Sequence, residues 1–230
     1  MFANMSLFGI SAWVLPVLLA ITFHEAAHGY VAWRLGDDTA YRQGRVTFNP
    51  FRHIDPFGTI VLPALLFFLT EGQFLFGWAK PVPVNFFRLR RPKRDMVWVA
   101  AAGPGINIVL ALASALLAHR APFVPDPAVD WVLQTLANSI FLNLLLAVFN
   151  MIPLPPLDGG RVAVGLLPPQ LARPLARLER FGLLILIAVL FLLPPLSTSL
   201  VGLRLDLFSA LILPIVWIFQ DLVFVLTGHI

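Results

Sequence analysis

Two histidines and a glutamate lie within five residues of one another, in the sequence His24-Glu25-Ala26-Ala27-His28. On a helix, residues i and i+4 share one face, so both imidazoles can reach the same metal ion. Glu25 lies beside them, where a carboxylate can act as general base toward a zinc-bound water. The pattern therefore predicts a zinc site with hydrolytic chemistry, with His24 and His28 as ligands.

Such a short pattern also recurs by chance at the polar end of a helix, so its surroundings decide between the two interpretations. The motif lies toward the end of a long apolar stretch that starts near Leu7. Ionisable groups inside a membrane span are energetically costly, rare and usually functional. Three of them in five positions favour the metal site.

A catalytic zinc usually has a third protein ligand and one open position. The chain has no cysteine, which excludes a thiolate ligand, a cysteine nucleophile and disulfides. Asp158 is the strongest candidate, because it lies in a proline- and glycine-rich segment whose irregular backbone can direct a carboxylate back into the protein. The alternatives are a solvated turn aspartate at position 158 and His53 as the ligand. His119 is expected on the opposite face of the membrane, and His229 lies next to the C-terminus.

The elements that position these residues are membrane helices. Of the 230 residues, 59% are hydrophobic and 12% are charged, whereas soluble domains are about 45–50% apolar and about 25% charged. We expect an all-α membrane bundle, because a span takes about 20 apolar residues. The five expected spans cover about 7–35, 96–118, 131–152, 181–196 and 207–227, with Pro194-Pro195 ending the fourth.

A sixth apolar stretch, 58–78, is interrupted by polar residues and by Pro63. Fourteen of the 16 Lys and Arg residues lie in three segments, 34–56, 77–95 and 153–180. Cytoplasmic loops are enriched in Lys and Arg, and all three segments share one face only if 58–78 enters the membrane and returns.

We therefore expect a re-entrant, partly extended element between the first and second spans. This topology places the N-terminus outside and the C-terminus in the cytoplasm. The first and third spans then run in the same direction, which brings His28 and Asp158 to the same side. The net charge of +4 reflects membrane orientation, and nucleic acid is not an expected partner.

Several motifs in order resemble the site-2 protease family of intramembrane metalloproteases. They are the H-E-x-x-H motif at 24–28, GRVTFNPFRHIDP at 44–56, GWAKPVPVN at 77–85, AGPGIN at 102–107 and NMIPLPPLDG at 150–159. The resemblance covers about residues 20–165. It indicates a minimal form without PDZ or CBS domain, as a single domain of residues 1–230. Its catalytic core would be about 7–165, followed by two helices at about 181–227.

The resemblance implies that His24, His28 and Asp158 bind one Zn²⁺ per chain and that Glu25 activates the water. It also implies an endopeptidase that cleaves transmembrane segments of other proteins within the lipid bilayer. Asn107 and Asn150 would bind substrate or support the site, and an interhelical hydrogen bond is the alternative role for a buried asparagine. The compact form favours a prokaryotic plasma membrane.

Two other functions compete with the protease. A metal transporter or metal-binding membrane protein would also need intramembrane His and Asp, but it gives Glu25 no special role. A non-catalytic scaffold would be expected to lack one of the four site residues, and all four are present. The residues from Lys80 to Asn85 contain Pro81 and Pro83, which favour extended backbone, so an edge strand that pairs with unwound substrate is one hypothesis. A plain structural loop is the other.

Overall fold

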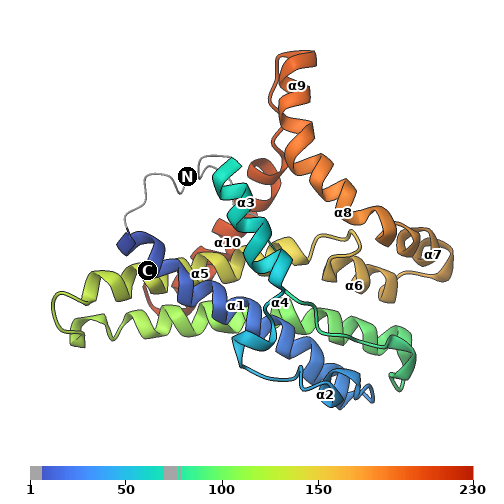
Figure 1. The fold of residues 1–230 in the computed structure, drawn as a ribbon, viewed down its shortest axis with the longest axis horizontal. Coiled ribbons are helices and arrows are strands. Elements are labelled where there is room, and N and C mark those ends of the chain that lie inside the picture. Colours follow the sequence, from blue (N-terminus) through green and yellow to red (C-terminus); the bar gives the residue numbers. More distant parts are fainter. Residues whose placement is uncertain (1–6, 70–76, 78, 230) are drawn as a thin grey trace.

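The computed structural model describes residues 7–69, 77 and 79–229. Within this part of the chain, five helical segments are long and apolar enough to cross a membrane, as the sequence predicts. Three of them, α1 (Leu7–Arg34), α4 (Pro92–Ala118) and α5 (Val129–Asn150), pack side by side and form the central bundle (Figure 1). The protein is therefore an integral, multi-pass membrane protein.

The fifth predicted span consists of a short π-helical turn (Phe208–Ile212) that continues into α10 (Leu213–Thr227). Val216 and Val223 of α10 pack into a buried core with Ala111 and Ala115 of α4 and Leu144 of α5. The two alanines allow the helices to approach closely, as small residues do in membrane bundles. α10 runs in the same direction as α4, since His119 Nε2 at the end of α4 lies 2.7 Å from the Thr227 carbonyl oxygen at the end of α10.

The two ends of the described chain consequently lie at the same end of the bundle (Figure 1). At this end, Trp131 Nε1 donates to Ser11 Oγ at 2.9 Å, and the rings of His119 and His229 lie 4.2 Å apart. The prediction that the chain starts and finishes on opposite faces is therefore wrong. It assumed that every apolar helix runs antiparallel to the previous one, and the fourth helix breaks this alternation.

The fourth apolar segment projects away from the bundle as an arm (Figure 1). It consists of α8 (Glu179–Ile187), a π-helical stretch (Ala188–Leu192) and α9 (Leu193–Val201). The prediction that Pro194-Pro195 ends this helix is wrong. Both prolines lie in the first turn of α9, where their missing N–H groups cost least. The arm ends instead at Gly202, whose φ of 69° is the left-handed conformation of a helix C-terminus.

The segment between α1 and α4 leaves the helix end and returns to it. It contains α2 (Thr39–Arg42), a 3₁₀ turn (Pro50–Arg52), a six-residue π-helical turn (Pro56–Val61), the eight-residue α3 (Leu62–Leu69) and a second 3₁₀ turn (Phe86–Arg88). The apolar helix from Pro56 to Leu69 is shorter than the roughly 20 residues that a span requires. Residues 70–76 and 78 lie outside the described part.

Hydrogen bonds join the two ends of this segment. Lys80 N donates to the His53 carbonyl at 2.9 Å, and the buried Arg45 donates to the carbonyl oxygens of both Arg52 and Lys80. Entry and exit are thus held side by side, as expected of a re-entrant element. Residues 79–85 form neither helix nor strand in the described structure.

Candidate metal centre

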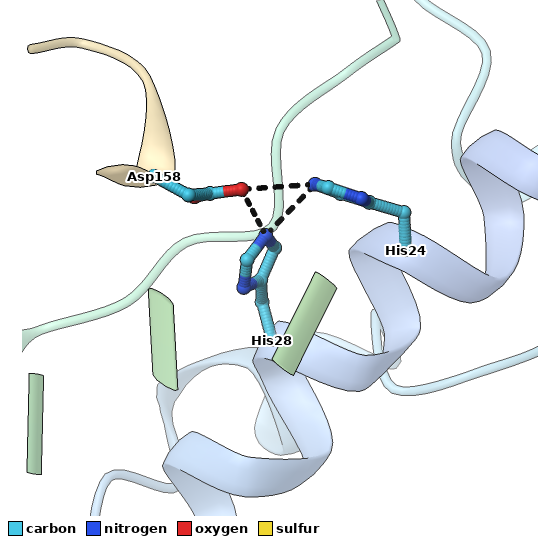
Figure 2. A group of neighbouring side chains, drawn as sticks. All are labelled: His24, His28 and Asp158. Carbon is cyan, nitrogen blue, oxygen red and sulfur yellow. Dashed lines mark hydrogen bonds and ion pairs between the residues drawn. The ribbon is translucent and has the colours of Figure 1, made fainter. Parts of the chain in front are cut away.

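One face of α1 presents His24 and His28 toward α4, and their Nε2 atoms lie 3.0 Å apart (Figure 2). The helical spacing of four residues places the two imidazoles one turn apart on the same face, as predicted from the motif. His24 is buried, with 8% of its surface exposed, and His28 is partly buried. The pair therefore lies inside the bundle.

Asp158 completes the group from a distant part of the chain. It is the first residue of α6 (Asp158–Leu166), which is followed by α7 (Pro169–Arg177). Its Oδ2 lies 3.2 Å from His24 Nε2 and 3.3 Å from His28 Nε2 (Figure 2). The irregular backbone after α5 packs directly on Gly159, where a Cβ would collide with the Met151 carbonyl. This close packing fixes the start of α6 and with it the carboxylate.

The three atoms form a nearly equilateral triangle that fits a tetrahedral metal ion. Bonds of about 2.0–2.1 Å to a tetrahedral zinc place its ligands about 3.3–3.4 Å apart, and the three edges here are 3.0, 3.2 and 3.3 Å. Asp158 Oδ2 is buried and has no hydrogen-bond partner of suitable geometry in the described structure. A metal ion on the triangle would satisfy it.

Hydrogen bonds on the far side of each imidazole fix the form that a metal ligand needs. His24 Nδ1 lies 2.6 Å from Asn107 Oδ1, and His28 Nδ1 lies 2.7 Å from the Val99 carbonyl oxygen. Because both partners are acceptors, each Nδ1 carries the proton, and both Nε2 lone pairs face the triangle. Such outer hydrogen bonds orient ligand histidines and raise their basicity.

Asn107 belongs to a buried polar chain between the helices. It is fully buried, and its Nδ2 donates to Asn143 Oδ1 of α5 at 2.7 Å. Asn143 Nδ2 in turn donates to the Ser139 carbonyl at 2.9 Å. These contacts leave Asn107 one orientation in which its oxygen faces His24.

Asp158 supplies the carboxylate of the group. An ionised carboxylate is the form that binds a metal. The donor set of two neutral imidazoles and one carboxylate therefore suits a divalent cation such as zinc.

Glu25 follows His24 on α1 and is partly buried. Its Oε2 accepts a hydrogen bond from Val82 N at 2.7 Å. Val82 lies in the segment that returns from the re-entrant element, so this segment is fastened directly to the carboxylate. A backbone N–H thus orients the Glu25 carboxylate.

The other predicted residues lie elsewhere. Asn150, at the end of α5, donates from Nδ2 to the Leu146 carbonyl of its own helix at 3.0 Å. His53 is buried but is not part of the His24, His28 and Asp158 group. His119 lies at the opposite end of α4, against the Thr227 carbonyl.

Gly103 of α4 is a site residue that the sequence argument did not single out. A Cβ built on it would lie 2.5 Å from both His24 Nε2 and His28 Nε2. Only glycine allows the α4 backbone to pass this close to the imidazoles. Its place in the A-G-P-G-I-N motif was visible, but the motif does not reveal which glycine faces the histidines.

The fold and site together define a membrane-embedded protein with a group of two histidines and one carboxylate that could hold a metal ion. Residues 125–193, which include Asp158, match the model of Peptidase family M50. "Putative zinc metalloprotease YwhC" of Bacillus subtilis (strain 168) is 40% identical over 79% of this chain and 80% of its own length. "Putative zinc metalloprotease Rip2" of Mycobacterium tuberculosis (strain H37Rv) is 35% identical over 85% of this chain and 71% of its own.

The chain belongs to peptidase family M50, the site-2 proteases, and is thus a metalloprotease, a hydrolase. The resemblance seen in the sequence motifs is confirmed. No solved structure gives a significant match to this chain.

Proposed function

We propose that this protein is an intramembrane zinc endopeptidase that cleaves peptide bonds in or near transmembrane segments of other membrane proteins. In this proposal, His24, His28 and Asp158 hold one zinc ion per chain, and Glu25 is the general base. The observation that supports it most strongly is the triangle of Nε2, Nε2 and Oδ2 atoms. It lies within an apolar bundle, with both Nδ1 atoms already hydrogen-bonded to acceptors.

When bound, zinc would lower the pKa of a coordinated water toward about 7 and polarise the scissile carbonyl. Glu25 would accept the proton of the attacking water at Oε1 and later deliver it to the leaving amine. The hydrogen bond from Val82 N holds the carboxylate at Oε2 while Oε1 moves the proton. Asn107 and the Val99 carbonyl would hold the imidazoles in place throughout.

The contacts of residues 80–85 support a role in orienting Glu25 more than a role in pairing with a substrate strand. Along 80–85, the N–H groups of Lys80 and Val82 are engaged with the His53 carbonyl and with Glu25. Pro81 and Pro83 have no N–H to offer. Residues 80–85 therefore have few free backbone N–H groups with which an edge strand could bind a substrate. The contact between Val82 N and Glu25 gives this segment another role, which is to orient the base.

The distribution of charge supports a proposed orientation. The three basic segments gather at the end of the bundle where α1 finishes and α4 begins, since Arg90 N donates to the Leu35 carbonyl and Lys93 Nζ donates to the Leu167 carbonyl. By the positive-inside tendency this end would face the cytoplasm of a bacterial cell. Both described ends of the chain would then face outward. Proposed partners are the bilayer and a membrane-protein substrate.

The alternative of a metal transporter predicts several ligand groups along a path. Within residues 7–69, 77 and 79–229, His24, His28 and Asp158 make up the single group of this kind that is close enough to share a metal.

Comparing the wild type with Glu25→Gln separates the two functions. The purified proteins would be reconstituted in lipid with a membrane-protein fragment that the wild type cleaves. The zinc content per chain would be measured for the wild type and for the variant. We expect the variant to keep its zinc and to lose cleavage by at least about 10²-fold, the lower range for general acid–base catalysis. Cleavage at the wild-type rate by Glu25→Gln would rule out the proposed mechanism.

A further inference from the structure

An apolar cavity of about 690 Å³ lies against α1, α5 and the re-entrant segment. Its lining includes Leu18 and Thr22 of α1, Leu146 and Phe149 of α5, and His53. This volume is in the range of about 300–1,000 Å³ that is typical of ligand sites. The cavity is therefore large enough to receive several side chains of another molecule.

The cavity reaches α1 about one helical turn before the proposed base. Ile21 and Thr22 line it, and Glu25 follows them by four and three residues, so all three share one face of α1. His24 and His28 occupy the face that meets α4. Ala79 also lines the cavity, in the same segment whose Val82 N–H holds Glu25. A chain seated in the cavity would thus lie about one helical turn from Glu25 along α1.

His53 supplies a buried polar group without a partner at this cavity. Only 2% of its surface is exposed, and its Nε2 lies 3.0 Å from the Thr47 carbonyl oxygen, which can only accept. The proton therefore sits on Nε2, and Nδ1 is an acceptor. This Nδ1 is buried with no hydrogen-bond partner among the described residues. Unpaired buried acceptors are rare, and each requires an explanation.

An unwound stretch of substrate carries backbone N–H donors that lack acceptors. A transmembrane helix satisfies its backbone internally, and once it is opened each freed N–H must find an acceptor inside the membrane. A lipid acyl chain could fill an apolar cavity, but it has no N–H to donate to His53. The unpaired acceptor therefore favours a peptide as the occupant.

We infer that the cavity receives the apolar side chains of the unwound substrate segment and that His53 Nδ1 accepts a hydrogen bond from a backbone N–H of that segment. This inference rests on the proposed protease function and names the substrate subsite of the same centre. His53 is then a substrate-binding residue and not a ligand of the metal.

The test uses the zinc-loaded Glu25→Gln protein in phosphatidylcholine nanodiscs, so that bound peptide is not cleaved. The probe is a synthetic 20-residue Leu/Ala peptide with lysines at both ends, a central Asn-Gly pair that weakens its helix, and one central cysteine. Because the chain has no cysteine of its own, single cysteines can be placed cleanly. Leu146→Cys lies in the cavity, and the exposed Leu133→Cys on the same helix is the matched control.

We expect a disulfide to form between the peptide and Leu146→Cys but not Leu133→Cys. We also expect His53→Phe to weaken peptide binding about fivefold, as for the loss of one hydrogen bond. His53→Asn, which keeps an acceptor near Nδ1, should restore most of the affinity. Leu145→Trp, which places a larger side chain at the cavity wall, should weaken binding as well.

Equal cross-linking at both positions, or an affinity within twofold of the parent in both His53→Phe and Leu145→Trp, would overturn the inference. Loss of zinc from His53→Phe would also overturn it, because it would assign His53 to the metal. The proposed protease function is judged separately, by zinc content and by cleavage that depends on Glu25. A negative result for the subsite therefore does not contradict the proposed protease function.

Discussion

Replacing Gly103 by alanine adds a single methyl group at the centre of the proposed zinc site. The new Cβ would lie 2.5 Å from His24 Nε2 and from His28 Nε2. Either α4 must move away or the imidazoles must turn, and turning them breaks their hydrogen bonds to Asn107 and to the Val99 carbonyl. Overpacking of this kind costs about 1–3 kcal/mol. If that cost falls on the metal-bound state, zinc binds about 5- to 150-fold more weakly.

Gly105 provides a matched control on the same helix. A Cβ at Gly105 meets no atom within 4 Å, so Gly105→Ala should leave the site untouched. Alanine is also the better helix former, by about 0.5–1 kcal/mol. The assay is zinc affinity, measured by competition with a chelator of known affinity, together with thermal unfolding of each purified variant.

We expect Gly103→Ala to lose zinc affinity and Gly105→Ala to keep it. The unfolding temperature of Gly105→Ala should equal or exceed that of the wild type. Unchanged zinc affinity in Gly103→Ala would refute the packing of α4 against the two imidazoles. Equal losses in both variants would show that the loss does not come from contact with the imidazoles, which would also contradict the reasoning.

Two further predictions concern the groups that orient the site. Asn107→Ala removes the acceptor of the His24 Nδ1 proton, and we expect zinc affinity to fall about 10- to 100-fold, measured by the same competition; unchanged affinity would contradict this role. Val82→Pro removes the N–H that holds Glu25. We expect cleavage to slow by about tenfold, as for loss of a charge-assisted hydrogen bond, while zinc content is unchanged. Val84→Pro is the control, and equal losses in both proline variants would indicate damage to the whole segment.

The metal group was predictable because it depends on local geometry and on coarse topology. The spacing of His24 and His28 fixes a shared helix face whatever the tertiary structure. The prediction of Asp158 as the third ligand required only that the first and third spans run in the same direction, and the positions of the basic loops indicated that they do. The structure brings these three residues together as expected.

The contacts between helices were not predictable in the same way. That Gly103 faces the imidazoles and that Asn107 meets His24 depends on how α4 is rotated about its axis. A helix that is apolar all round gives no periodic signal for that rotation. The sequence offered Asn107 as a substrate-binding or supporting residue, and its contact with His24 favours the supporting role.

The C-terminal third shows a second limit of sequence patterns. Pro194-Pro195 is a helix-ending signal in isolation, but the π-helical stretch before it shifts the backbone so that the prolines begin a new helical turn. Counting apolar stretches likewise assumes that each one reverses the chain direction. Here α10 runs in the same direction as α4, and its Val216 and Val223 share a buried core with Ala111 and Ala115 of α4.

The most direct test of the metal centre is the zinc content of the purified wild type and of Asp158→Ala. Asp158 supplies the third atom of the triangle, at 3.2 and 3.3 Å from the two Nε2 atoms. We expect about one zinc per chain in the wild type, as for a three-ligand catalytic site, and much less in Asp158→Ala. Full retention of zinc by Asp158→Ala would contradict the site proposed here and would place the third ligand elsewhere in the chain.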